Sequence, residues 1–294
     1  MDWRFDLALL LQSVLDLGLS ELSESLQRRP QDLNEALDFL ATDQKSDLIR
    51  QTHNINHQKQ KQWLLQNNVR LCLYSESDYP RVMLDWSHAP QALWYLGAPV
   101  WNQRPSVAVV GSRNPSTNSA QWMNWRLMQF LKSRPATVVS GGARGVDQLA
   151  HWLAIREKIP TVALMPVGLQ YRYPPDFFRM EPSILNGGGA ILSPFRPDWP
   201  LYKANFARRN QVIAALSQIT LVVEARRRSG TLLTAKAAIN LDRPIGVLPC
   251  SPMSAQGLGG LDLLCESEAS VLIRDDKDLI LLWDRTSGSQ GRIC

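Results

Sequence analysis

Cysteine is scarce in this sequence. The 294 residues include four cysteines, which stand far apart and form neither a Cys-x-x-Cys pair nor a cluster with histidine: Cys72, Cys250, Cys265 and Cys294. That spacing argues against a zinc site and against a disulfide framework. We therefore expect no metal and no other cofactor, and we expect the reducing cytoplasm as the location.

Long hydrophobic runs are missing as well. No apolar stretch approaches the roughly 20 residues that a membrane-spanning helix needs. The run LALLLQSVL near the N-terminus is too short for a secretory leader and has no small-residue cleavage site. We expect neither a leader nor an association with a membrane.

Three glycine motifs that mark common enzyme classes are also absent. The phosphate loop GxxxxGK[ST] and the hydrolase turn GxSxG do not occur. A dinucleotide site needs GxGxxG after the first strand and an acid about 20 residues further on. Here Gly111 is followed by Ser112 and Arg113, and the next strand ends in SGG with no acid. The sequence therefore does not predict a dinucleotide enzyme, a P-loop NTPase or an α/β-hydrolase.

The composition is that of a folded domain. Hydrophobic residues make up 45% of the chain and charged residues 20%, which is typical of a globular protein with a real core. Residues 1–65 are polar, with apolar residues at helical spacing, and predict a small helical N-terminal region. From residue 69 onward, short apolar runs alternate with helical stretches. This alternation predicts an α/β fold with a doubly wound, mostly parallel sheet that carries helices on both faces.

The expected strands are the runs VRLCLY, ALWYLG, SVAVVG, ATVVSG, TVALMP, GAILSP, ITLVVEA, IGVLP and SVLI. Helices are expected near 117–133, 146–157, 202–217 and 231–241. We expect one domain over 66–283 and a polar tail over 284–294. Ligands of doubly wound folds bind beyond the carboxyl ends of the strands, so the motifs that follow strands are the candidate site.

The first strand-end motif is VAVVGSRNPS, residues 107–116. Its glycine permits a tight turn, while the Ser112 hydroxyl and free backbone N–H groups can hold an anion at the start of the next helix. Arg113 adds a forked and permanently charged donor. The alternative is an ordinary strand–helix turn with a surface arginine.

The second motif is VVSGGARGVDQLAH, residues 138–151. Its three glycines allow the backbone to approach a ligand closely. Asp147 and His151 share one helix face, but one carboxylate and one imidazole are too few ligands for a metal ion. We expect Asp147 to complement the helix dipole from the first turn rather than to serve in acid–base catalysis.

The third motif is the most basic part of the chain. Residues 201–230 hold six cationic side chains and one acid, so their net charge of +5 equals that of the whole chain. Three consecutive arginines, 226–228, stand where an apolar strand meets a helix. With Phe206 nearby, this pattern fits a groove for single-stranded nucleic acid, in which cations follow the phosphates and a ring stacks on a base. The alternative is a solvated basic face whose aromatic neighbours belong to the core, and charge alone does not decide between the two.

Four motifs in this order, VAVVGSRNPS, VVSGGARGVDQLAH, FARRNQVIAALS and VVEARRRSGTLLTAKAA, resemble those of the DNA-processing protein A family (DprA/Smf). The preceding segment LYSESDYPRVMLDWSHAPQALWYLG is similar too, so the resemblance covers roughly residues 70–250 and, more weakly, extends to 275. It implies an extended Rossmann fold that binds single-stranded DNA and dimerises. It also implies a role in natural transformation, or competence, and in DNA recombination, in which the protein helps to load the recombinase RecA onto incoming strands. In that role the protein is not an enzyme.

The resemblance also assigns site residues by position. The phosphate-binding loop falls on Gly111, Ser112 and Arg113, and on Ser140, Gly141, Gly142 and Gly145. The base-contacting stretch falls on Phe206, Arg208, Arg209 and Asn210. A helix N-terminus on the ligand side of the sheet falls on Ser229, Gly230 and Thr231, and Arg226 would enlarge the positive field around it.

The sequence departs from the family pattern in four places. In the usual FPxRNR, Ala207 replaces the proline and Gln211 replaces the second arginine, which removes one cation. Cys250 stands where a glycine usually follows a proline. The stretch GLGGLDLLCESEAS lacks the asparagine of a Gly-x-Asn-x-Leu-Ile pattern, which bears on the last part of the fold and on the dimer surface. Finally, we expect the winged-helix domain of many members to be absent.

Two rival functions remain open. One is a nucleotide phosphoribohydrolase of the related Rossmann-like superfamily, whose GGxGTxxE motif carries a glutamate. Here Gly230-Thr231 is followed by Leu232, Leu233 and Thr234, so that carboxylate is missing. The other is a sensor of a small nucleotide that uses the same anion loop without DNA.

Overall fold

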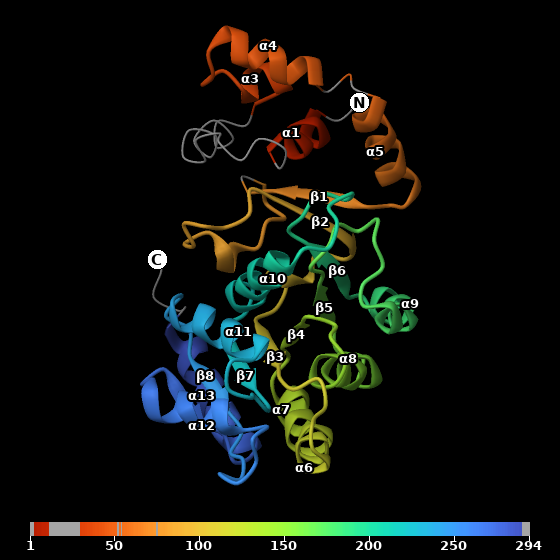
Figure 1. The fold of residues 1–294 in the computed structure, drawn as a ribbon. Coiled ribbons are helices and arrows are strands. Elements are labelled where there is room, and N and C mark those ends of the chain that lie inside the picture. The colour runs from red at the N-terminus through yellow and green to blue at the C-terminus, as the bar shows by residue number, and fades with distance from the viewer. Residues whose placement is uncertain (1–2, 12–29, 52, 54, 75, 290–294) are drawn as a thin grey trace.

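The structure is a computed structural model that describes residues 3–11, 30–51, 53, 55–74 and 76–289. Helices at the N-terminal end lie above a long sheet, and the C-terminal helices lie at the opposite end of that sheet (Figure 1). No helix in these ranges is long and apolar enough to span a lipid bilayer.

The strands are β1 (Arg70–Leu73), β2 (Ala92–Gly97), β3 (Ser106–Val110), β4 (Thr137–Ser140), β5 (Thr161–Leu164), β6 (Ala190–Ser193), β7 (Ile219–Val222), β8 (Ile245–Val247) and β9 (Ser270–Leu272). The α-helices are α1 (Trp3–Leu11), α3 (Leu33–Ala36), α4 (Thr42–Gln51), α5 (Ile55–Gln66), α6 (Thr117–Trp122), α7 (Met128–Ser133), α8 (Val146–Arg156), α9 (Glu181–Asn186), α10 (Lys203–Ala215), α11 (Gly230–Ile239), α12 (Leu258–Glu266) and α13 (Asp276–Ser289). Shorter helical segments are η1 (Arg81–Met83), η2 (Val100–Asn102), η4 (Pro175–Arg179) and the π-helix η3 (Met123–Leu127), which joins α6 to α7.

The strands form one nine-stranded sheet in the order β1-β2-β6-β5-β4-β3-β7-β8-β9. β3 to β9 pair in parallel, whereas β2 runs antiparallel to both β1 and β6. Within the parallel part, the chain moves outward from β3 through β4 and β5 to β6, and then returns through α10 to β7 on the other side of β3. The switch point of this fold therefore lies between β3 and β7, where ligands of open parallel sheets bind.

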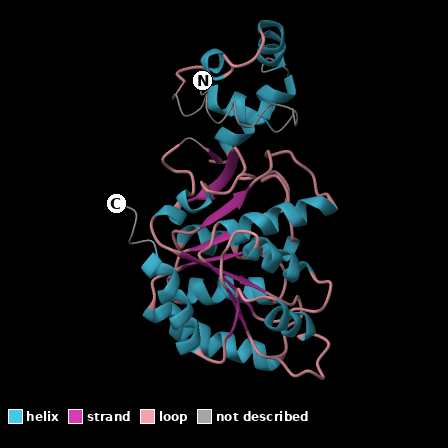
Figure 2. Ribbon diagram, turned by 90° about the vertical axis from the view of Figure 1, so that its left-hand side faces the viewer, coloured by secondary structure: helices cyan, strands magenta, loops and turns pink. Residues whose placement is uncertain are grey.

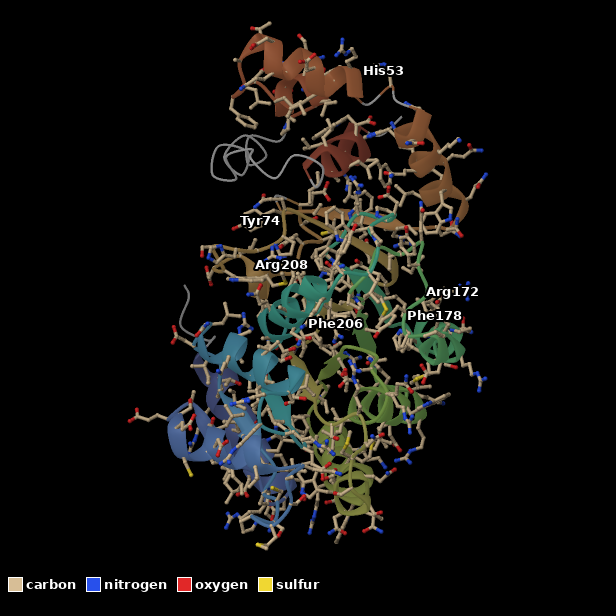
Figure 3. The ribbon with its side chains drawn as sticks, viewed as in Figure 1. His53, Tyr74, Arg172, Phe178, Phe206 and Arg208 are labelled. Atoms are coloured by element: carbon tan, nitrogen blue, oxygen red, sulfur yellow. The ribbon has the colours of Figure 1, made fainter. Side chains whose placement is uncertain are left out.

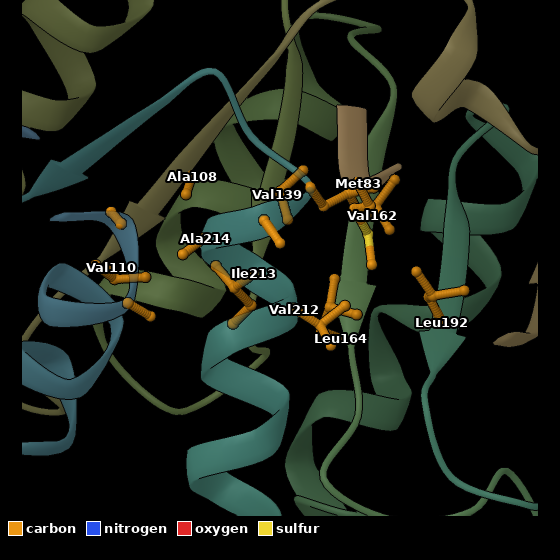
Figure 4. Close-up of a cluster of buried hydrophobic side chains, with 14 of the residues drawn as sticks. Met83, Ala108, Val110, Val139, Val162, Leu164, Leu192, Val212, Ile213 and Ala214 are labelled. Carbon is orange, nitrogen blue, oxygen red and sulfur yellow. The ribbon is translucent and has the colours of Figure 1, made fainter. Parts of the chain in front are cut away.

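Helices cover both faces of the sheet (Figure 2). Apolar residues of α10, α11 and α12 pack on one face, while those of α7, α8 and α13 pack on the other. Val212 of α10 lies beside Leu164 of β5, while Ile213 lies on the side of Val110 of β3, in the first of these clusters (Figure 4). The central strands β3 and β4 are buried at every position, so their apolar residues follow one another without alternation, Val107–Val110 in β3 and Val138–Val139 in β4.

The N-terminal helices share a core with the sheet. Leu7 of α1 and Leu64 of α5 belong to one buried cluster with Leu71 of β1 and Trp94 of β2. Lys61 of α5 also contacts Asp6 of α1 through an ion pair of 2.8 Å. The helices before residue 66 therefore cover the antiparallel end of the sheet.

The predicted fold class is confirmed, and each of the nine expected runs contains a strand. The sequence did not reveal α12, because Gly259 and Gly260 weaken its helical pattern. The structure gives a reason for the first of these: a β-carbon added to Gly259 would lie 2.7 Å from the Arg226 carbonyl oxygen. α13 runs across the expected start of a tail at residue 284, and Trp283 is buried against the sheet layer.

Candidate functional site

The three strand-end motifs meet in one cavity at the switch point. The cavity measures about 360 Å³. It is lined by Val110, Gly111, Ser112, Arg113, Asn114, Ala143, Asp147, Phe206, Arg209, Asn210, Glu224, Arg226, Ser229, Gly230, Thr231, Leu233 and Thr234. These residues come from the ends of β3 and β7, from the loop before α8 and its first turn, from α10, and from the start of α11. The cavity therefore lies where the doubly wound fold predicts a ligand.

The loop after β3 is fixed by its contacts with the start of α8. The backbone N–H of Val146 donates to the Ser112 carbonyl at 3.1 Å, and that of Asn114 donates to the Ser112 hydroxyl at 3.1 Å. Gly145 has a φ of 89°, and a β-carbon there would lie 2.4 Å from the Ser112 carbonyl oxygen. Only glycine fits at this crossing of two loops. Arg113 itself is exposed at the rim of the cavity.

Arg209 is the buried cation of the site. Its side chain reaches from α10 over the end of β4, and the residue is only 6% exposed. The Nη1 atom lies 4.0 Å from a carboxylate oxygen of Asp147. Burial lowers the pKa of Arg209, and the neighbouring charge of Asp147 raises it; an arginine stays protonated under either influence. Its buried Nε has no hydrogen-bond partner among the described residues, which leaves a donor for a ligand.

Asp147 is an internal acceptor in this arrangement. It receives hydrogen bonds from the backbone N–H groups of Gly141 at 3.2 Å and Ala143 at 3.4 Å. Burial raises the pKa of Asp147 to about 6, although Arg209 and these two N–H groups lower it. The carboxylate therefore holds both the glycine loop and Arg209 in position, which is more than the dipole role that the sequence predicted.

His151, the other polar residue of the second motif, is fully buried. Burial lowers its pKa to about 3, and the charge of Arg209 adds to that effect. Its Nδ1 lies 2.7 Å from the Thr161 hydroxyl, which in turn donates to the Val138 carbonyl. The His151 ring is therefore neutral, donates to Thr161 and packs against the strands.

The first turn of α11 faces the cavity. The four leading N–H groups of a helix lack intrahelical partners and carry partial positive charge. The Ser229 hydroxyl at this end is buried without a hydrogen-bond partner among the described residues. Thr231 donates to the Gly111 carbonyl at 3.1 Å, and Asn210 donates to the Gly230 carbonyl at 3.1 Å. These two bonds tie the helix end to β3 and to α10.

The triple arginine separates into three environments. Arg226 lines the cavity. Arg227 forms a forked pair with Asp262 of α12, with distances of 2.6 and 2.7 Å. Arg228 is exposed and has a φ of 58°, an uncommon backbone conformation that lets the chain turn into α11. One of the three consecutive cations is therefore available to a ligand inside the cavity.

An aromatic wall stands beside these cations. The Phe206 ring lines the cavity and contacts the Tyr173 ring edge-on, with centroids 5.7 Å apart. Arg209 lies over the Phe206 ring at 5.9 Å from its centroid. This pairing of ring and guanidinium resembles the stacking platforms on which bases lie in single-strand binders.

The structure brings together ten of the fifteen residues expected at the site, all lining the cavity: Gly111, Ser112, Arg113, Phe206, Arg209, Asn210, Arg226, Ser229, Gly230 and Thr231. Four others lie behind it. The Ser140 hydroxyl donates to the Val109 carbonyl inside the sheet, while Gly141, Gly142 and Gly145 shape the loop.

Arg208 is the exception among the expected residues. It lies outside the cavity, with its guanidinium 5.1 Å from the centroid of the Trp86 ring. Neighbours on a helix point in directions about 100° apart, so Arg208 and Arg209 cannot face the same side. Figure 3 shows Arg208 with Tyr74 on one side of Phe206, and Arg172 with Phe178 on the other.

The remaining lining residues were not expected to contact a ligand: Val110, Asn114, Ala143, Asp147, Glu224, Leu233 and Thr234. Glu224 accepts a hydrogen bond from the Ser116 N–H at 3.0 Å and so anchors the start of α6. Thr234 lies one turn after Gly230, a spacing that places both on one face of α11. The spacing from Gly230 was the indication in the sequence that Thr234 would line the cavity. Across the described ranges, no group of three or more His, Cys, Asp or Glu side chains could hold a metal ion.

Residues 70–283 match the family described as DNA recombination-mediator protein A. This match covers the whole sheet and every element of the cavity. The chain belongs to the DNA recombination-mediator protein A family. A curated relative, protein Smf of Synechocystis, is 33% identical over 239 residues, which are 80% of this chain and 59% of the relative. The chain thus spans less than two thirds of that relative.

Two solved structures of the family have the same architecture. DNA processing protein A from Streptococcus pneumoniae superposes with a TM-score of 0.78 at 26% identity, over 95% of this chain and 97% of that one. DNA processing protein A from Helicobacter pylori, for which a single-stranded DNA binding mode is described, gives a TM-score of 0.64 at 27% identity. That match covers 74% of this chain and 96% of the other.

Proposed function

We propose that this chain binds single-stranded DNA in the strand-end cavity and serves as a non-catalytic mediator of DNA recombination and natural transformation. One observation carries the proposal: Arg113, Arg209 and the N-terminal end of α11 converge on one cavity that Phe206 also lines. Membership of the recombination-mediator family and the single-strand binding described for the Helicobacter pylori relative support it.

The chemistry of the cavity suits a phosphodiester and a base together. A phosphate at the end of α11 would accept from backbone N–H groups and from the Ser229 hydroxyl, with Arg113 and Arg226 close by. A base attached to the same backbone would stack on Phe206, because every base has an apolar face. The site therefore has the means to hold a strand without reading its sequence.

The two carboxylates in the cavity support a binding role rather than a catalytic one. Asp147 accepts from two backbone N–H groups, and Glu224 accepts from the Ser116 N–H. Both hold the walls of the cavity in place. The position that follows the Gly230-Thr231 helix start in the hydrolase pattern holds Thr234, which has no acid–base group in the accessible pH range.

Competition between single-stranded and duplex DNA tests the proposal. Wild-type protein bound to labelled oligo(dT) is titrated with unlabelled oligo(dT), with duplex of mixed sequence, and with nucleoside monophosphates, at equal nucleotide concentration. We expect oligo(dT) to compete best, since the cavity accepts one backbone and one exposed base. Duplex that competes equally well, or a mononucleotide that displaces the strand at equal concentration, would contradict the proposal.

By resemblance to the family, we also propose two partners: the recombinase RecA and a second copy of this chain. β9 is the strand at one edge of the sheet, and its Leu272 side chain is 42% exposed. In a dimer, the second copy of the chain would cover this apolar edge. Sedimentation at tens of micromolar protein should show twice the mass of the chain, and a monomer would remove the dimer. Co-sedimentation with RecA on oligo(dT) tests the other partner.

A further inference from the structure

A second cavity, larger than the strand-end cavity, is lined in part by the loop that follows β5. It measures about 700 Å³ and lies between α5, the β2 end and α9. Its lining includes Trp63 and Arg70 near the N-terminal helices, and Tyr171, Arg172 and Phe178 from the segment before α9. None of these residues belongs to the strand-end cavity.

Like the first cavity, the second is lined by aromatic side chains and arginines. Three aromatic rings and two arginines line it, together with one acid, Glu181. The Arg172 guanidinium lies over the Phe178 ring at 5.0 Å from its centroid, and no ion pair joins Arg172 to a carboxylate within the described part of the chain. Burial raises the pKa of Glu181, and the charge of Arg172 lowers it. Aromatic side chains next to an arginine without an ion pair can bind a nucleotide. The base stacks on the rings, and the phosphate pairs with the guanidinium.

The two cavities are joined by three consecutive residues. Tyr173 contacts the Phe206 ring, which lines the first cavity, whereas Tyr171 and Arg172 line the second. Because successive Cα atoms lie about 3.8 Å apart, this loop is a short bridge between them. Arg172 and Phe178 lie on the α9 side of Phe206 (Figure 3). A strand that leaves the first cavity over Phe206 and Tyr173 would therefore next meet Tyr171 and Arg172 of the second cavity.

We propose that the second cavity holds a further nucleotide of the same single strand, with its base among Trp63, Tyr171 and Phe178 and its phosphate at Arg172. The inference rests on the proposed function and extends it by naming where the strand continues. It also gives the N-terminal helices a role in the interface, because Trp63 lies in α5.

Oligonucleotides of two lengths test the inference. Affinity for labelled oligo(dT) of about four and about ten nucleotides is measured by fluorescence anisotropy, lengths that bracket one and more than one cavity. Three variants are compared with wild type. Arg172→Ala removes the proposed phosphate contact. Glu181→Gln removes the acid of the second cavity. Arg179→Ala removes another exposed arginine, in η4, that lines neither cavity.

We expect wild type to bind the longer strand more tightly, and Arg172→Ala to lose about tenfold on the longer strand while binding the shorter one normally. Glu181→Gln should bind the longer strand more tightly than wild type does, and Arg179→Ala should match wild type on both. If both strands bind wild type but Arg172→Ala behaves like Arg179→Ala, the inference is wrong and the proposed function stands. If neither strand binds wild type, the proposed function itself fails.

Discussion

Arg209 occupies the space that a side chain on Gly141 would fill. A β-carbon added to Gly141 would lie 1.5 Å from the Arg209 Nη1 atom and 2.9 Å from an Asp147 oxygen. Gly141, directly after β4, therefore leaves the space in which the buried guanidinium of Arg209 lies. It shapes the site through Arg209 rather than by contacting a ligand itself. This relationship links the second motif of the sequence to the third.

Gly141→Ala should displace Arg209 and weaken strand binding. We also expect a loss of about 1–3 kcal/mol in the free energy of unfolding, because the guanidinium is enclosed and the added methyl overpacks it. Oligo(dT) affinity and urea unfolding measure the two effects. Gly230→Ala is the control for stability, since a β-carbon there meets nothing within 4 Å. A Gly141→Ala protein that unfolds and binds like wild type would show that Arg209 moves aside freely.

Phe206→Ala should weaken binding of oligo(dT) by about 1–3 kcal/mol, the usual contribution of one base stacked on an aromatic ring. Phe206→Trp keeps a ring at the wall and should retain most of the affinity. Arg208→Ala changes the neighbouring charge outside the cavity and should cost less than Phe206→Ala. If Phe206→Ala binds as tightly as Phe206→Trp, the ring belongs to the core only.

Binding should strengthen as the pH falls towards 6. Burial raises the pKa of Asp147 to about 6 in the free protein, although the charge of Arg209 opposes this rise. A phosphate that engages Arg209 adds negative charge and raises the pKa of Asp147 further. The complex therefore takes up a proton, so affinity rises as the pH falls through the higher pKa of the complex and levels off below about 6.

The variant Asp147→Asn isolates this effect. It should bind more tightly than wild type near pH 8, by about tenfold if the ligand raises the pKa of Asp147 by one unit. Its affinity should change less than that of wild type between pH 8 and pH 6. Oligo(dT) titrations across this range measure both proteins, and parallel curves would remove Asp147 from the linkage.

The strands and the position of the strand-end cavity were predictable because each rests on local signals. Apolar runs mark buried parallel strands, and the glycine and arginine motifs directly follow β3, β4 and β7. The direction of individual side chains was not predictable in the same way. Arg208 and Arg209 are adjacent in the sequence, yet one lies on Trp86 and the other lines the cavity.

Contacts between residues that are far apart in the sequence were not predictable either. Arg227 contacts Asp262, which lies in a helix that the glycine-rich sequence did not predict. The unusual Cys250 is accommodated by a glycine later in the same loop, because a β-carbon on Gly257 would lie 1.7 Å from its Sγ atom. The second cavity also combines α5 with the segment before α9, far apart in the sequence, so no motif marks it.

If phosphates of a single strand bind at the cavity rim beside Arg113, a salt titration of two arginine variants should reveal it. Oligo(dT) affinity is measured at several salt concentrations for wild type, Arg113→Ala and Arg227→Ala, with melting temperatures alongside. Arg113 is exposed at the cavity, whereas Arg227 is paired with Asp262 outside it. We predict that Arg113→Ala melts normally, loses about 1–3 kcal/mol of binding and has a salt slope smaller by about one, while Arg227→Ala loses less. An Arg113→Ala protein that melts normally and binds oligo(dT) with the affinity and salt slope of wild type would contradict the account.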